Sequence, residues 1–114
     1  MLKIKEEGNK MIGKVVEIGK MNVVVELSIN DEQKKNIVNF HVAFDTDKTT
    51  IIGEVTKINQ NKAEIALVGE IDEGRFVPGI SKKPFYNAPC RIITNEEKKM
   101  VFDFILENNY PLTR

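Results

Sequence analysis

Hydrophobic and polar residues alternate along most of this chain, as in strands that have one face on a core and the other in water. The third alternating segment has apolar side chains at every second position from Val38 to Phe44. Phe40 therefore faces the core with them, and His41 lies on the opposite face. We predict strands at 10–18, 22–27, 37–44, 49–58, 62–71 and 90–93, so the predicted fold class is mainly β.

Two polar segments between predicted strands have the composition of hairpin turns. Residues 45–48 read Asp-Thr-Asp-Lys, and residues 59–61 read Asn-Gln-Asn. Asparagine tolerates the left-handed backbone conformation that a tight hairpin needs. We therefore expect an antiparallel hairpin at each of these positions.

The segment 11–18 is repeated, with substitutions, at 51–58, and each copy precedes a turn and another strand. Each copy has a glycine at its third position, Gly13 and Gly53, which suits a bend or bulge at the corner of a barrel. Two related hairpins can wrap a small barrel, and closure removes exposed sheet edges. We expect a small five- or six-stranded antiparallel barrel.

The period changes near the end of the chain. Thr94 and Glu97 have the spacing of a capping box. Apolar residues then follow at helical spacing, at positions 100, 101, 104 and 105. We predict a lead-in at 1–9, a barrel domain at 10–94, one C-terminal α-helix at 95–108 and the start of a linker at 109–114.

Composition limits the possible functions. The chain has 114 residues and a formal net charge of zero, from 17 basic and 17 acidic residues, so contact with an anionic polymer would require a local patch. One cysteine and one histidine are too few for a structural zinc site or a disulfide framework. No apolar run has signal-peptide or bilayer-spanning character. We expect a cytoplasmic protein without membrane contact.

Motifs for catalysis are weak. Residues 8–14 have the glycine and lysine spacing of a P-loop, but Val15 stands where the motif needs Ser or Thr, and a strand continues where a helix is needed. The acidic pairs near Asp45 and Asp72 are interpreted as turns rather than metal ligands. His41, Cys90, Ser28 and Ser81 form no recognisable nucleophilic motif. We predict no catalytic residue, cofactor or metal, and no enzymatic activity for this chain alone.

The segment 74–91 differs most from the rest of the chain, because it holds three of the four prolines, four basic residues and no acidic residue. Its aromatic side chains alternate with the basic ones, as in surfaces that stack on single-stranded nucleic acid. A loop that closes the barrel with its aromatics in the core is the favoured interpretation, because the net charge is zero; a subunit interface is the third. The candidate interface or binding residues are Arg75, Phe76, Lys82, Lys83, Phe85, Tyr86 and Arg91.

An ordered set of short segments resembles the N-terminal barrel of bacterial HerA-type ATPases, which is called the HAS barrel. The segments are Ile12-Gly13-Lys14-Val15, Val23-Val24-Val25-Glu26-Leu27, Ile51-Ile52-Gly53-Glu54-Val55, Leu67-Val68-Gly69-Glu70-Ile71, Gly74-Arg75-Phe76-Val77-Pro78-Gly79-Ile80 with Lys83-Pro84, and Arg91-Ile92-Ile93-Thr94-Asn95-Glu96-Glu97. Together they span residues 10 to 97.

This resemblance implies the assembly and partner-docking barrel of a hexameric, ATP-dependent DNA translocase or helicase of the FtsK/HerA class. It further implies double-stranded DNA as the substrate of the full assembly, and a nuclease or sirtuin-like effector as the partner in DNA-end processing or anti-phage defence. The intact P-loop of that family is missing from this chain, so the ATPase activity does not carry over to it. The alternative is a free-standing nucleic-acid-binding β-barrel that uses loop 74–91.

Overall fold

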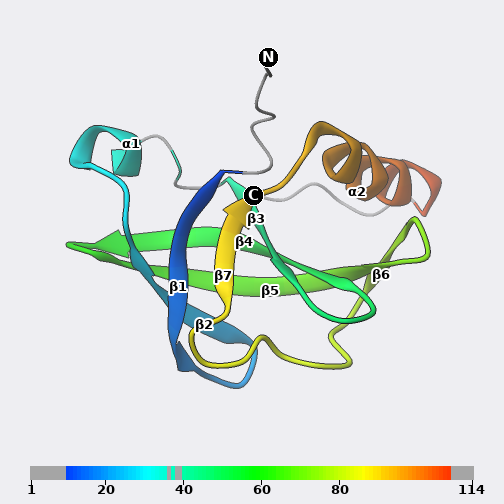
Figure 1. The fold of residues 1–114 in the computed structure, drawn as a ribbon. Helices are drawn as coiled ribbons and strands as arrows, with labels where there is room; N and C mark the ends of the chain where they lie inside the picture. Colours follow the sequence, from blue (N-terminus) through cyan, green and yellow to red (C-terminus); the bar gives the residue numbers. More distant parts are fainter. Residues whose placement is uncertain (1–9, 36, 38–39, 109–114) are drawn as a thin grey trace, which may run out of the picture.

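The computed structural model describes residues 10–35, 37 and 40–108, and Figure 1 shows their arrangement. The elements, in chain order, are β1 (Met11–Ile18), β2 (Asn22–Leu27), α1 (Asp31–Lys35), β3 (His41–Asp45), β4 (Thr50–Asn59), β5 (Lys62–Asp72), β6 (Arg75–Pro78), β7 (Pro89–Ile92) and α2 (Asn95–Glu107). The predicted lead-in at 1–9 and linker at 109–114 lie outside the described residues.

Six strands form a closed antiparallel barrel, followed by the C-terminal helix. The strand order is β2-β1-β7-β3-β4-β5, and pairing of β2 with β5 closes the ring. Strand β6 lies outside the ring and pairs with the far end of β5. The predicted class, the barrel and the helix are confirmed, with six strands rather than five in the ring.

The internal repeat corresponds to a repeated hairpin. In the β1–β2 hairpin Val15 pairs with Val25, and the register then shifts by one residue. In the β4–β5 hairpin Val55 pairs with Ile65, and the same shift follows. The bulge therefore occurs at the equivalent place in both copies, with Val16 and Thr56 as the extra residues, so the repeat specifies the bend as well as the strands.

A pseudo-two-fold axis relates the two halves of the barrel. Val24 and Glu64 occupy equivalent positions in the two hairpins, and they lie opposite each other where β2 pairs with β5. On the other side of the ring, Ala43 of β3 lies opposite Arg91 of β7. Strand β3 flanks β4 as β7 flanks β1, so the whole ring follows the symmetry of the repeat.

Two apolar clusters hold these elements together. Val42 and Phe44 belong to the larger one, which fills the barrel. The smaller one lies on the outer face, where Ala43 and Ile93 pack against Val101 of α2. His41 precedes Ala43 by two positions, so it lies on the outer face, as predicted. Phe40 was expected in the core and is instead 46% exposed, because the chain turns there and its N–H donates to the Ile37 carbonyl (2.9 Å).

The predicted capping box and hairpins are present, but the structure differs from the prediction in one turn residue and in two additional elements. The capping box is present: the Thr94 hydroxyl accepts from the Glu97 N–H at 3.0 Å, and the Glu97 carboxylate accepts from the Thr94 N–H at 2.9 Å. Both predicted hairpins form, but Gln60 rather than an asparagine adopts the positive φ, at 59°. Helix α1 and strand β6 were not predicted.

No helix in the described part of the chain has the length and apolar character needed to cross a membrane.

Replacing Gly53 with Val should destabilise the barrel by about 1–3 kcal/mol, the usual range for overpacking. A Cβ at this position would lie 2.5 Å from Ile65 Cγ2 and 3.1 Å from the Ala66 carbonyl oxygen. Urea unfolding should show a lower midpoint with an unchanged slope. The control Lys57→Val, at an exposed position of the same strand, should change stability by less than about 0.5 kcal/mol. Equal midpoints for Gly53→Val and the native chain would show that the close approach is not a constraint.

Candidate interaction surfaces

Arg91 is buried and holds three parts of the fold together. Its Nε and Nη2 donate to the two Asp45 carboxylate oxygens, both at 2.9 Å. Its Nη1 and Nη2 donate to the Glu97 oxygens at 3.0 and 2.8 Å. Such two-pronged contacts with carboxylates are strong and directional. Arg91 therefore connects β7 to the end of β3 and to α2, and it is not available for the surface role that its place in segment 74–91 suggested.

The charges around Arg91 shift one another's proton affinity. Burial raises the pKa of Glu97, but hydrogen bonds from Arg91 and from the Thr94 backbone outweigh it, so the net pKa is lowered. The hydrogen bonds from Arg91 likewise lower the pKa of Asp45, and both carboxylates raise the pKa of Arg91. All three groups therefore stay charged at neutral pH.

The first two candidate residues of the segment lie on β6. The Phe76 ring packs edge to face on Phe104 of α2, with centroids 5.4 Å apart and planes at 65°. This contact gives Phe76 a structural role between β6 and the helix. Arg75 is exposed beside it and lines a hollow together with Asp103 and Glu107.

The loop between β6 and β7 is anchored at several points. Pro84 and Ala88 are buried, and the buried Glu70 carboxylate accepts bonds from the Ser81 N–H and hydroxyl at 2.5 and 2.8 Å. Lys83 Nζ donates to the carbonyl of Gly19 in the β1–β2 turn at 2.6 Å. The loop closes this end of the barrel through its small and proline residues rather than through its aromatics.

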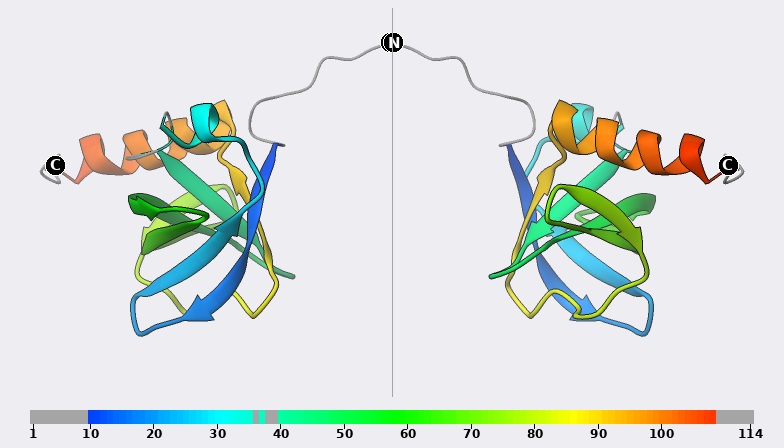
Figure 2. Two further views of the ribbon diagram at one scale, coloured as in Figure 1. Left: turned by 90° about the vertical axis from the view of Figure 1, so that its left-hand side faces the viewer. Right: turned by 90° about the vertical axis from the view of Figure 1, so that its right-hand side faces the viewer.

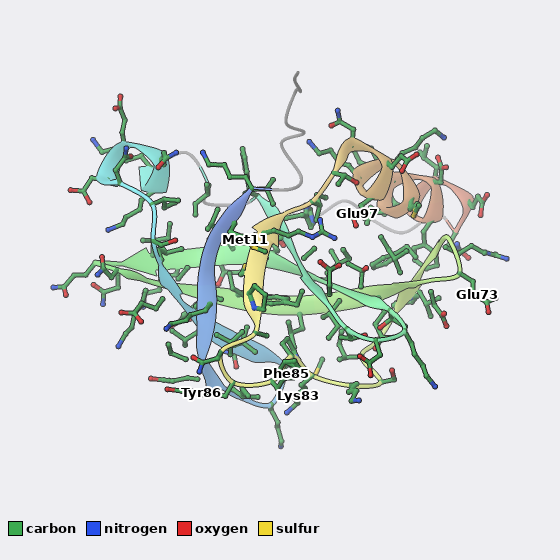
Figure 3. All side chains as sticks on the ribbon, viewed as in Figure 1. Met11, Glu73, Lys83, Phe85, Tyr86 and Glu97 are labelled. Atoms are coloured by element: carbon green, nitrogen blue, oxygen red, sulfur yellow. The ribbon has the colours of Figure 1, made fainter. Side chains whose placement is uncertain are left out.

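Four exposed residues of this loop, Lys82, Lys83, Phe85 and Tyr86, form what we call the aromatic tip. Phe85 is 63% exposed and Tyr86 62%, which contradicts the favoured expectation that these rings fill the core. In Figure 3 both lie at the end of the barrel away from the helices, with Lys83 beside them. Lys20 and Met21, in the neighbouring turn, are also exposed, and neither was predicted from the sequence to belong to a binding surface.

The pseudo-symmetry shows how unusual the exposure of Phe85 is. The Phe40 N–H donates to the Ile37 carbonyl at 2.9 Å, and the Ala88 N–H donates to the Phe85 carbonyl at 3.0 Å. Phe85 thus occupies the turn position that Ile37 occupies in the other half. Ile37 is buried in the barrel core, so the corresponding apolar position is covered in one half and left uncovered in the other.

The possible catalytic groups are not brought together. Cys90 is fully buried, and burial raises the pKa of its thiol strongly. Burial is also the main reason that the pKa of His41 is lowered, and His41 lies on the outer face while Cys90 lies in the barrel core. Ser81 is bonded to Glu70, and the remaining candidate, Ser28, is exposed. No hydrogen bond between a nucleophile and His41 is present in the described part of the chain.

The two other sequence patterns have structural explanations. Gly8 and Asn9 of the P-loop-like segment lie outside the described residues, whereas Met11 to Lys14 belong to β1, as the strand interpretation predicted. Asp45 binds Arg91. Residues 10–35, 37 and 40–108 contain no group of three or more His, Cys, Asp or Glu side chains placed to hold a metal ion.

Replacing Glu97 with Gln should lower the free energy of unfolding by about 1–2 kcal/mol at pH 7, because a hydrogen-bonded charge pair with Arg91 is lost. Folding lowers the pKa of Glu97. The charged Glu97 side chain therefore makes its full contribution to the free energy of unfolding above the unfolded-chain pKa of about 4.3, and this contribution disappears as pH falls through the native pKa. The difference between the variant and the native chain should therefore narrow below about pH 4. Urea midpoints measured from pH 7 to pH 3 test this.

The control for this series is Asp103→Asn, which removes an exposed ion pair with Lys99 on the same helix. Its effect should stay within about 0.5 kcal/mol. A Glu97→Gln difference that is equally large at every pH would contradict the charge-pair explanation.

Comparison with known proteins finds no protein family and no curated protein that matches this chain.

Proposed function

We propose that this chain is the assembly and partner-docking barrel of a HerA-like, ATP-dependent DNA translocase. The proposal includes a hexameric ring in the cytoplasm and a nuclease or sirtuin-like effector, acting in DNA-end processing or phage defence. Its first support is the ordered set of sequence segments that resembles the HAS barrel. Its second is the architecture, since a closed six-stranded barrel followed by one helix agrees with that resemblance.

The observation that carries the docking role is the exposure of Phe85 and Tyr86 on an anchored loop. Aromatic side chains supply much of the energy of protein interfaces. The buried Pro84 and the bond from Lys83 to Gly19 limit the motion of the loop, so little conformational entropy is lost when the rings are covered. The lysines of the tip stay at the wet edge, where charge mainly influences association rate.

The link to an ATPase has a direct test in the gene. The reading frame should continue past the codon for Arg114 and encode a P-loop, with a glycine-rich turn, Lys and Ser or Thr between a strand and a helix. A frame that stops soon after this codon, or that continues without such a motif, would overturn the HerA-like assignment. Such a result would not bear on the docking role of the aromatic tip, which has its own test.

The aromatic tip should be needed for assembly of the complete gene product. We expect Phe85→Asp with Tyr86→Asp to shift sedimentation from hexamers to smaller species at the same protein concentration, because two charges would have to be buried in the contact. Leu106→Asp is the matched control, since Leu106 is also exposed but lies on α2, at the other end of the barrel. Circular dichroism and the unfolding midpoint should show that both variants fold. Intact hexamers in the folded double variant would exclude the tip from ring assembly.

A specific observation also favours the second candidate, a nucleic-acid-binding barrel: two exposed rings lie beside Lys82 and Lys83 on one loop. Against it, Arg91 and Phe76 are engaged within the fold. A fluorescein-labelled oligothymidylate separates the candidates. Binding that depends on Phe85 and weakens steeply with salt would favour nucleic acid, because phosphate contacts release counterions.

A further inference from the structure

A groove lies between the two helices, at the end of the barrel opposite the aromatic tip. Figures 1 and 2 show α1 and α2 at this same end. The groove has a volume of about 560 Å³. Ile12, Ile92 and Ile93 line it from the barrel, and Phe40 and Phe102 line it from either side.

The charged side chains of the described residues that line the groove are both basic, Lys10 and Lys98. No carboxylate from the described part of the chain lines it. Neither lysine forms an ion pair with another described residue. Glu54 lies opposite His41 where β3 pairs with β4 and raises the pKa of His41, although burial lowers that pKa overall. Glu54 does not line the groove.

Helix α2 has different charged side chains beside the groove and beside the hollow next to β6. Lys98 and Phe102 face the groove. Asp103 and Glu107 face the hollow on the other side of the helix, next to β6. The groove is thus apolar at its base and basic at its edge, although the whole chain has no net charge.

The apolar surface extends beyond the groove itself. Phe102 is 53% exposed, and Leu106, one helical turn further along α2, is 74% exposed. Exposed apolar surface that is continuous with a groove is typical of sites that bind another polypeptide. A small ligand held within the groove would leave Leu106 uncovered.

We propose that this groove binds an acidic amphipathic segment of a partner protein, with apolar side chains on one face and carboxylates beside them. The apolar face would cover Phe102 and Leu106, and the carboxylates would pair with Lys10 and Lys98. A second copy of this chain fits less well, because its aromatic tip would bring Lys82 and Lys83 against the groove lysines. This site is separate from the aromatic tip and does not depend on the proposed function.

The probe is a fluorescein-labelled helical peptide with leucine at helical spacing and glutamate elsewhere. Two controls are a peptide of the same composition in scrambled order and a peptide with lysine in place of glutamate. By fluorescence anisotropy, the acidic amphipathic peptide should bind the full chain at least about tenfold more tightly than either control. Equal binding of the three peptides, or none, would overturn the proposal.

Charge reversal tests the role of the groove lysines. Lys98→Glu should weaken binding of the acidic peptide about tenfold and strengthen binding of the basic one, a reversal that loss of structure would not produce. Lys48→Glu, the same change in the exposed β3–β4 turn, should leave both affinities unchanged. An unchanged preference in Lys98→Glu would contradict the proposal.

Two further experiments test the apolar contact at Phe102 and the location of the peptide-binding site. Phe102→Asp should abolish peptide binding while the chain stays folded, with only a modest decrease in the unfolding midpoint, since the residue is 53% exposed. Amide chemical shifts should move in α2 and at the start of β1. Three results would each overturn the proposal. The first is chemical-shift changes confined to residues 82–87, and the second is loss of peptide binding in the Phe85→Asp and Tyr86→Asp double variant. The third is self-association of the chain that Phe102→Asp removes. The double variant should still bind the acidic peptide, so the proposals for the groove and for the aromatic tip can be disproved independently of each other.

Discussion

The Arg91 guanidinium binds Asp45 and Glu97 at once, and the position of α2 depends on this interaction. Arg91 lies on the pseudo-two-fold axis, opposite Ala43. Its partner Glu97 also caps the helix, so one carboxylate fixes both the start of α2 and its attachment to the barrel. The helix in turn covers the outer apolar cluster and forms one side of the groove. Removing either carboxylate would leave Arg91 paired with the other one, so the compensation of its buried charge would be weakened but not lost.

The barrel is symmetric in its strands and asymmetric in its connections. The two hairpins share register and bulge, because the repeated segments place glycine and valine at the same positions. The connections have diverged: residues between β2 and β3 form α1, whereas those between β5 and β7 form β6 and the anchored loop. The closed ring has no free strand edge, whereas the short strand β6 outside it pairs on one side only, with β5. The proposed contacts with other molecules therefore use side chains at the two ends of the ring rather than strand addition to it.

Both ends of the barrel carry exposed apolar side chains beside lysines, in a chain whose charges sum to zero. Four of the 17 acidic residues are bound within the fold: Asp45 and Glu97 bind Arg91, Glu70 binds Ser81, and Asp103 pairs with Lys99. The basic character of the two ends is therefore a result of how the fold distributes charge rather than of an excess of lysine. With the two docking surfaces that we propose, one barrel would contact two different neighbours through its two ends.

The sequence by itself determined the six strands of the ring and the capping box, because each depends on contacts between residues close together in the chain or on the alternation of one strand. It indicated a bend or bulge at Gly13 and Gly53, and the bulge that the two hairpins share lies three residues further along, at Val16 and Thr56. It did not indicate β6, which lies outside the ring. It did not determine which residues of segment 74–91 are exposed. Phe76 and Phe85 look alike in sequence, yet the first packs on Phe104 and the second is uncovered, because the position of α2 decides which ring meets a partner. Arg91 looks like a surface cation until folding brings Asp45 beside it, 46 positions away along the chain. The groove likewise exists only where α1, α2 and the end of the barrel meet, so long-range packing alone created it.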